Sequence, residues 1–145
     1  MRGRPKGLRC RSRRSYAVVR ANNVFHKLRE RDGLDQPAIE AALSTTPADV
    51  LTSGSDEAHD LWHLVLESAR LDEVVDQAVR TLELSVVAKY AFGLAQAFNG
   101  FYHRYPILNE ERQDVRLWRA AAVAYYRAQL TSALDLMGCT VPARM

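Results

Sequence analysis

Residues 83–104 read ELSVVAKYAFGLAQAFNGFYHR, and the fold class follows from this stretch. Its apolar side chains recur every three or four positions for about six turns, which is the period of a helix with one buried face. A strand would alternate apolar and polar residues, and no such alternation is sustained. We expect a helix from about Glu83 to Arg104, ended by Pro106. The predicted buried stripe is Val87, Tyr90, Ala91, Leu94, Phe98, Phe101 and Tyr102.

The same helical period extends through the rest of the chain from Ser15 onward, so no sheet is expected. The predicted class is all-α, an antiparallel bundle of about five to six helices. Residues 34–55 are expected to be a connector around a short helix at Ala38–Leu43. Four other helices are expected. The first runs from its cap Ser15 to about Arg31 and is stopped by Gly33, and the second is Asp56–Ala69, capped by Ser55 or Ser53. The third runs from Leu71 to about Leu82, and the last runs from Asn109 to Met137 and is stopped by Gly138.

Periodicity also predicts which side chains of the two middle helices are buried. In the helix over 56–69 the inward residues are expected to be Leu61, Trp62 and Val65. In the helix from Leu71 they are expected to be Val74, Val75, Ala78, Val79 and Leu82.

The length of 145 residues, with 48% hydrophobic and 26% charged residues, fits one globular domain and excludes global disorder and a disulfide scaffold. The longest apolar run, Ala120 to Tyr126, is far below the ~20 residues of a membrane helix. The two cysteines, Cys10 and Cys139, have no metal-binding spacing and favour a reducing compartment. We therefore expect a cytoplasmic protein.

The net charge of +3 hides an uneven distribution. Residues 1–14 contain seven basic residues and no acid, which leaves 13 basic against 17 acidic residues in the remainder. We expect residues 1–14 to form a basic, disordered leader and residues 15–145 to form a single helical domain. Such a leader can neutralise nucleic-acid phosphates, although a solvated leader without a ligand would have the same composition.

Few residues have the spacing of a metal or catalytic site. His59 and His63 lie one helical turn apart, near Glu57 and Asp60, but no third ligand follows at a recognisable spacing. The sequence also has no glycine-rich phosphate loop and no nucleophile motif. We therefore expect no metal, no cofactor and no catalytic residues.

The first predicted helix has one compact polar face. At 100° per residue, Tyr16, Arg20, Asn23 and Lys27 lie within about 60° of one another. The apolar residues Val18, Ala21, Phe25 and Leu28 fall on nearly the opposite side. An aromatic ring, a guanidinium, an amide and an ammonium are the groups that bind unpaired bases and phosphates, so this face is a candidate nucleic-acid-binding site.

Three segments resemble the C-terminal anticodon-binding domain of arginyl-tRNA synthetases, the all-helical DALR type. Residues 16–25, YAVVRANNVF, are similar to that family's Tyr-Ala-x-x-Arg helix. Residues 94–102, LAQAFNGFY, followed by PIL at 106–108, resemble its Leu-Ala-x-x-Phe-x-x-Phe-Tyr helix. The most specific match is residues 133–145, ALDLMGCTVPARM, which resembles its Leu-x-Leu-Leu-Gly-x-x-x-Pro-x-x-Met terminus.

The resemblance, which covers about residues 16 to 145, implies the anticodon-binding fold of class I synthetases and contact with the anticodon stem-loop of arginine tRNA. It places Tyr16 and Arg20 at the anticodon loop and Met145 beside them. Asn23 and Lys27 come from the helix geometry alone. A synthetase catalytic domain acting in trans is a second partner that the resemblance suggests.

The chain also departs from the family. Arg11-Ser12-Arg13-Arg14-Ser15 stands where the family has a Gly-Pro-Tyr stretch, and no His-x-Gly-His or Lys-Met-Ser-Lys-Ser motif occurs. Aminoacylation by this chain alone is therefore not expected. The alternatives are a helical protein-interaction domain, a truncated synthetase remnant that docks on a partner, and the related domain of a glycyl-type synthetase, against which residues 142–145 argue.

Overall fold

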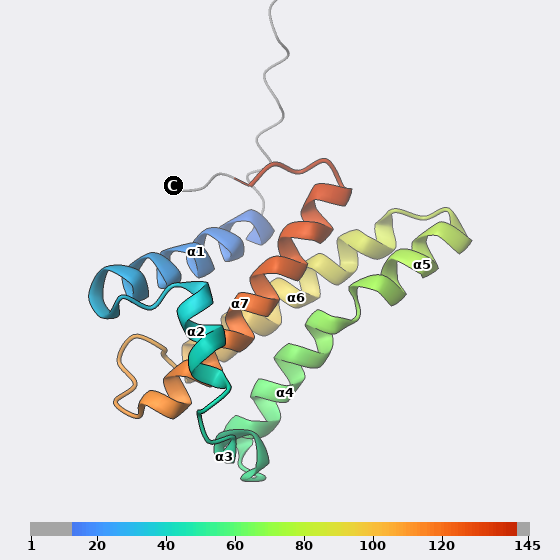
Figure 1. Cartoon of the computed structure of the whole chain (residues 1–145). Coiled ribbons are helices and arrows are strands. Elements are labelled where there is room, and N and C mark those ends of the chain that lie inside the picture. The colour runs from blue at the N-terminus through green and yellow to red at the C-terminus, as the bar shows by residue number, and fades with distance from the viewer. Residues whose placement is uncertain (1–12, 142–145) are drawn as a thin grey trace, which may run out of the picture.

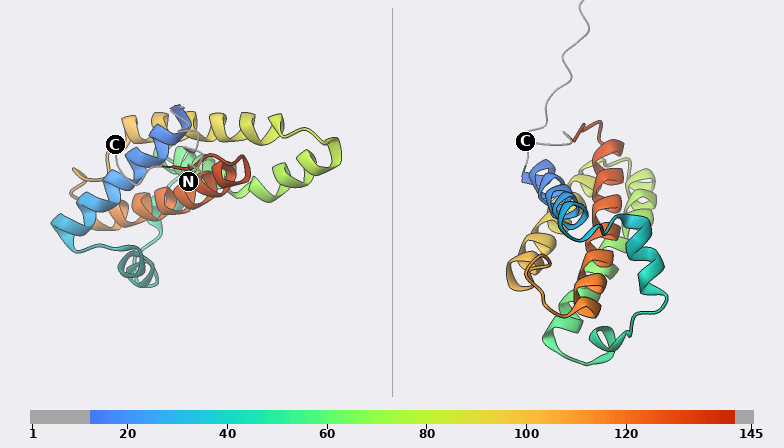
Figure 2. Two further views of the ribbon diagram at one scale, coloured as in Figure 1. Left: turned by 90° about the horizontal axis from the view of Figure 1, so that it is seen from above. Right: turned by 60° about the vertical axis from the view of Figure 1, so that its left-hand side comes forward.

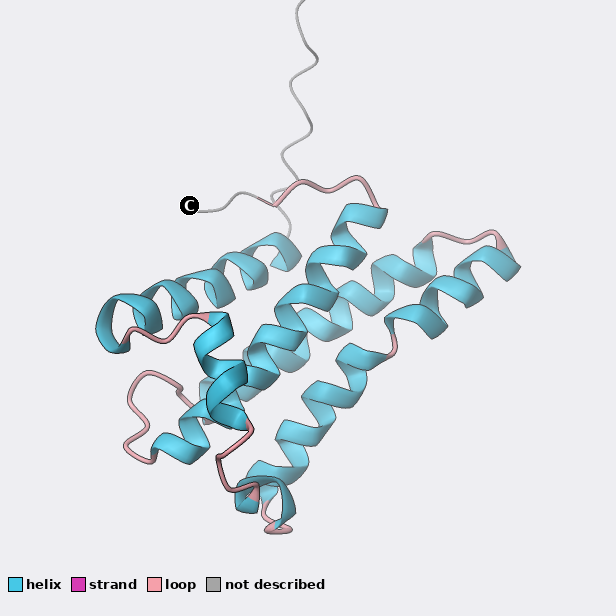
Figure 3. Ribbon diagram, in the orientation of Figure 1, coloured by secondary structure: helices cyan, strands magenta, loops and turns pink. Residues whose placement is uncertain are grey.

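The computed structural model describes residues 13–141, with side chains from Tyr16 onward. This part of the chain contains helices and no strand (Figures 1 and 3). Six helices have eight residues or more, which confirms the predicted all-α bundle, and α3 adds a single turn that was not predicted. The helices are α1 (Arg13–Asp32), α2 (Gln36–Leu43), α3 (Asp49–Thr52), α4 (Asp56–Ala69), α5 (Leu71–Thr81), α6 (Ser85–Arg104) and α7 (Gln113–Leu136).

The long helix α7 lies at the centre of the bundle. It contacts α1, α2, α3, α4 and α6, and α1 packs across both α6 and α7 (Figures 1 and 2). The chain runs along α4 and α5, reverses at residues 82–84, and returns along α6, against which α5 packs. The described part of the C-terminal segment extends from the end of α7 toward the N-terminal end of α1 (Figure 1).

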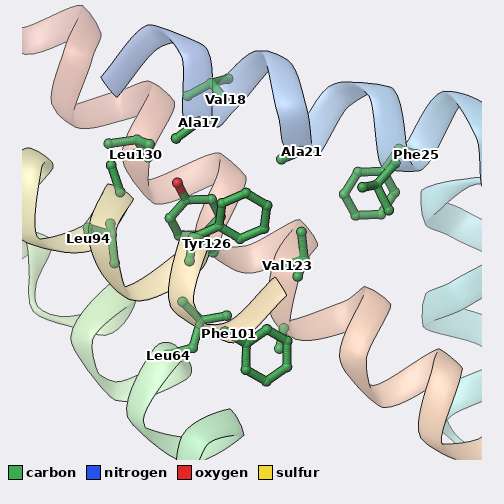
Figure 4. Packing of buried hydrophobic residues seen from close by; sticks show 14 of the residues in the cluster. Ala17, Val18, Ala21, Phe25, Leu64, Leu94, Phe101, Val123, Tyr126 and Leu130 are labelled. Carbon is green, nitrogen blue, oxygen red and sulfur yellow. The ribbon is translucent and has the colours of Figure 1, made fainter. Parts of the chain in front are cut away.

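The core is formed where α1, α4, α6 and α7 meet (Figure 4). The rings of Phe98 on α6 and Tyr126 on α7 stack with centroids 4.5 Å apart. The apolar face predicted for α1 is buried, with Ala21 and Leu28 both 0% exposed. Burial of this face orients α1, so the opposite face of the helix is directed away from the core.

Most predicted helix ends agree with the structure. Ser55 caps α4, with its Oγ accepting the Ala58 N–H at 3.2 Å. Gly33 and Gly138 follow α1 and α7 with φ of +65° and +70°, a conformation that glycine adopts without steric cost. The short helix predicted at Ala38–Leu43 begins two residues earlier, because Asp35 caps it at Ala38 N.

Three predicted ends were wrong. The helix α1 begins at Arg13, so Ser15 lies within its first turn and does not cap it. The helix α7 begins at Gln113 and not at Asn109, because the Glu110 carboxylate pairs with Arg119 at 2.8 Å and also accepts the Arg112 N–H. The helix α6 starts at Ser85 and not at about Glu83, because residues 82–84 form the reversal. The leader predicted over residues 1–14 lies outside the described residues except for the backbone of its last two.

Three residues expected to be buried are exposed. Trp62 is 44% exposed because its indole N–H donates to the Leu51 carbonyl at the surface, and Leu64 is buried in its place. Val79 and Leu82 are 67% and 90% exposed, since α5 packs on α6 and its last turn extends past the core. Within residues 13–141, no helix is long and apolar enough to cross a membrane.

Candidate nucleic-acid interface

The four candidate residues of the first helix lie on one side of α1, and we call them the α1 face: Tyr16, Arg20, Asn23 and Lys27. Tyr16 is 55% exposed, Asn23 and Lys27 are exposed, and Arg20 is half-buried. The structure therefore brings these four together on the solvent side of α1. The fifth candidate, Met145, lies outside the described residues and stays a prediction.

Arg20 is held from the side by two residues of α6. Its Nη1 donates a hydrogen bond to Asn99 Oδ1 at 3.2 Å, and its Cζ lies 4.8 Å from the centroid of the Tyr102 ring. A cation over an aromatic face gains electrostatic attraction, and one hydrogen bond uses only one of the five guanidinium donors. The Arg20 guanidinium is therefore fixed in direction while most of its donors are unused.

The support for Arg20 continues into the core. The Tyr102 ring stacks on Phe98 at 5.8 Å between centroids, and Phe98 stacks on Tyr126. Since Phe98 and Tyr126 are both 0% exposed, Tyr102 rests on a rigid base. The position of the Arg20 guanidinium thus depends on packing between α6 and α7.

Asn99 is the residue of this site that sequence reasoning missed. It follows Phe98 directly, so it lies next to the predicted buried stripe of α6. The one sign of it in the sequence was an amide next to an apolar stripe, which another helix was expected to cover. The contact to Arg20, 79 residues away, could not be read from spacing.

The described arginines of α1 differ from most other arginines of the bundle in having no carboxylate partner. Among the described side chains, six arginines pair with a carboxylate within 4.0 Å, and none of the six is on α1; they are Arg70, Arg80, Arg104, Arg112, Arg116 and Arg119. No carboxylate lies within that distance of Arg20, Arg29 or Arg31 of α1 in the described part of the chain. These α1 arginines therefore keep an unneutralised positive charge.

A second half-buried cation lies on the other side of α1. Arg127 of α7 sits 4.3 Å over the Phe25 ring and donates to Asn22 and Gln36, and burial lowers the pKa of its guanidinium. A pocket of about 340 Å³ beside it is also lined by Val141. The last described residue of the chain thus lies next to α1.

The two histidines considered as metal ligands, His59 and His63, are exposed on α4. The nearby carboxylates are engaged: Asp60 Oδ2 accepts from Arg104 at 2.6 Å and from the Tyr105 hydroxyl, and Glu57 pairs with Arg119. Within residues 16–141 the structure gathers no group of three or more residues able to hold a metal ion.

An all-α bundle whose first helix presents a cationic, aromatic face defines a helical domain with a candidate nucleic-acid-binding surface. The model of the DALR anticodon binding domain matches residues 14–145, and the chain belongs to this family.

Known proteins similar to this chain are arginine--tRNA ligases. That of Methanosarcina barkeri is 31% identical over 131 residues, which are 90% of this chain and 21% of the relative. That of Phocaeicola vulgatus is 32% identical over 130 residues, 90% of this chain and 20% of the relative. That of Methanosarcina mazei is 39% identical over 82 residues, 57% of this chain. The chain spans about a fifth of the length of the first two.

Proposed function

We propose that this chain is a tRNA-binding module that contacts the anticodon stem-loop of arginine tRNA through the α1 face and is not catalytic by itself. The observation that carries the proposal is Arg20, which Asn99 and Tyr102 hold beside the exposed Tyr16 in a member of an anticodon-binding family. The arginine tRNA is proposed because the similar proteins are arginine--tRNA ligases.

Each residue of the α1 face has a chemical role in this proposal. The Tyr16 ring stacks on an unpaired base, an interaction that contributes ~1–3 kcal/mol per base. The Arg20 guanidinium contacts a phosphate or a base edge with its unused donors. Asn23 reads a base edge, Lys27 holds a phosphate, and Met145 packs against the same loop.

The direct test is binding of labelled stem-loop RNAs by fluorescence anisotropy. Tyr16→Ala is expected to weaken binding of the arginine tRNA stem-loop by about 5- to 150-fold, the equivalent of ~1–3 kcal/mol. Arg20→Ala should weaken binding and reduce the preference over an unrelated stem-loop. The matched controls are Tyr125→Ala and Lys89→Ala, which alter an exposed ring on α7 and an exposed cation on α6.

Equal affinity for both RNAs that survives Tyr16→Ala and Arg20→Ala would eliminate this mode of binding. The proposed lack of catalysis is tested separately, with arginine, ATP and arginine tRNA. Formation of arginyl-tRNA by the purified chain alone would contradict it.

An apolar groove favours a second candidate function, docking on a synthetase catalytic domain in trans. The groove of about 200 Å³ lies between α3, α4 and α7 and is lined by Trp62, Trp118 and Tyr125 among others. In the relatives, about four fifths of the chain lies outside the matched part, so a catalytic domain is the natural occupant. Sedimentation of the chain with and without such a domain tests this second function. If no complex forms while stem-loop binding is retained, docking is contradicted and the RNA-binding proposal stands.

A further inference from the structure

A second pocket, of about 500 Å³, opens where the C-terminal end of α1 meets the loop between α6 and α7. We call it the α1 C-terminal pocket, and it is lined by Lys27, Glu30, Arg31, Leu108 and Asn109. Arg31 Nη1 donates to the Leu108 carbonyl at 2.9 Å, which holds the guanidinium against the loop. No other hydrogen bond or ion pair of Arg31 is present in the described part of the chain, so its remaining donors are unused.

This pocket continues the α1 face. At 100° per residue Arg31 falls within about 60° of Tyr16, on the same side of the helix. Lys27 belongs to both the face and the pocket. With a rise of 1.5 Å per residue, Arg20 and Arg31 are roughly 16 Å apart along the helix axis. One extended ligand can therefore contact both.

The side chains of the pocket favour a phosphate over a base stacked on an aromatic ring. Lys27 and Arg31 have no carboxylate within 4.0 Å among the described residues, and Asn109 adds an amide. The one acid, Glu30, has its Oε2 3.1 Å from His26 Nδ1, one helical turn back along α1. None of the five lining residues is aromatic, so an unpaired base has no ring to stack on.

We infer that the α1 C-terminal pocket binds a backbone phosphate of the RNA stem adjoining the loop that Tyr16 and Arg20 contact. This inference rests on the proposed function and names the residues that would contact the stem. The pocket supplies affinity without sequence preference, whereas the first turns of α1 supply the preference.

The competing explanation for these cations is structural, because positive charges in the last turn of a helix stabilise its dipole. Arg29 and Arg31 are both in that last turn. However, Arg29 lies about 160° around the helix from Arg31 and does not line the pocket. Arg29→Gln is therefore a matched control for the Arg31→Gln part of the test variant, since it removes one guanidinium charge from the same last turn.

The experiment is a salt series of stem-loop binding from about 50 to about 200 mM, with each variant's fold checked by circular dichroism. Because the two cations are proposed to hold one phosphate, Lys27→Gln with Arg31→Gln should reduce the magnitude of the slope of log K against log salt by about 0.9, the contribution of one phosphate contact. The loss should be the same for arginine and unrelated stem-loops. Arg29→Gln should keep the wild-type slope.

A further variant leaves both cations in place. Asn109→Asp adds a carboxylate to the pocket and should weaken binding of both stem-loops. The inference is overturned if the double variant keeps the wild-type slope, if it behaves like Arg29→Gln, or if its loss depends on the loop sequence. If the wild-type chain binds no stem-loop, the proposed function fails and this inference fails with it. If only the Tyr16 and Arg20 variants lose binding, the proposed function stands without the stem contact.

Discussion

Arg119 of α7 and Glu57 of α4 form an enclosed ion pair between two helices, with 2.6 Å between Arg119 Nε and Glu57 Oε1. The Arg119 side chain is 6% exposed and also pairs with Glu110 at 2.8 Å and donates to the Pro106 carbonyl at 2.9 Å. This one guanidinium joins α4, α7 and the loop before α7. The same contacts keep Glu110 outside the helix that the sequence predicted to begin at Asn109.

Replacing Arg119 by methionine should lower the free energy of unfolding by about 3–5 kcal/mol, because Glu57 and Glu110 would keep their charges without a partner. Urea denaturation measures the change. Adding Glu57→Gln and Glu110→Gln should recover part of the loss. The control is Arg112→Ala, which breaks the exposed pair with Asp114 and should change stability little. If the two substitutions lowered the free energy of unfolding equally, the enclosed pair would stabilise the bundle no more than the exposed pair.

Tyr126 carries a buried hydroxyl that has no hydrogen-bond partner among the described residues. Burial alone raises the pKa of this hydroxyl well above its usual range. Tyr126→Phe removes the unpaired group and should leave the free energy of unfolding within about 1 kcal/mol of wild type or slightly higher. Tyr126→Ala should cost about 3–5 kcal/mol because it leaves a cavity against Phe98. A loss above about 1 kcal/mol in Tyr126→Phe would mean that the hydroxyl has a partner after all.

Ionisation of Tyr90 should lower the folding stability of the bundle at high pH. Burial, and then the charge of Glu67, raises the pKa of Tyr90 from 10.0 to about 12, and its hydroxyl donates to the Ser68 carbonyl at 2.9 Å. Since the pKa is higher in the folded state, this contribution to stability is complete below pH 10 and is lost as the pH rises through about 12. Tyr90→Phe should make the fall in stability over that range smaller, as thermal melts at successive pH values would record. An unchanged pH profile would assign the alkaline loss to other groups.

Asn99 should act on RNA binding only through Arg20. Asn99→Ala frees the guanidinium and is expected to weaken stem-loop binding while changing stability by less than about 1 kcal/mol. Asn99→Asp should weaken binding more, because a carboxylate at the 3.2 Å position would neutralise the Arg20 charge while holding it in place. Anisotropy at one fixed salt concentration ranks the two. If Asn99→Asp bound as tightly as wild type, the charge of Arg20 would not be in contact with RNA.

Local patterns predicted the helices well, and long-range contacts explain what they missed. The bounds of α4 and the buried side of α1 follow from a cap and from periodicity, both of which are local. Trp62 and Val79 were misjudged because helix period identifies an apolar stripe but not how much of it a neighbour covers. In the same way, the α1 face could be located from the sequence, while the support of Arg20 by Asn99 depends on how α1 crosses α6.

The peripheral position of α5 has a consequence for the dynamics of the domain. This helix packs against α6 and buries Leu71 and Val74; it is followed by Leu82, which has a left-handed conformation and an exposed side chain. A segment with so small an anchored surface opens by local unfolding at far lower free energy than the whole domain. Backbone amides of α5 should therefore exchange with deuterium well before those of α7. A peptide inserted at residues 82–84 should leave RNA binding by the α1 face unchanged.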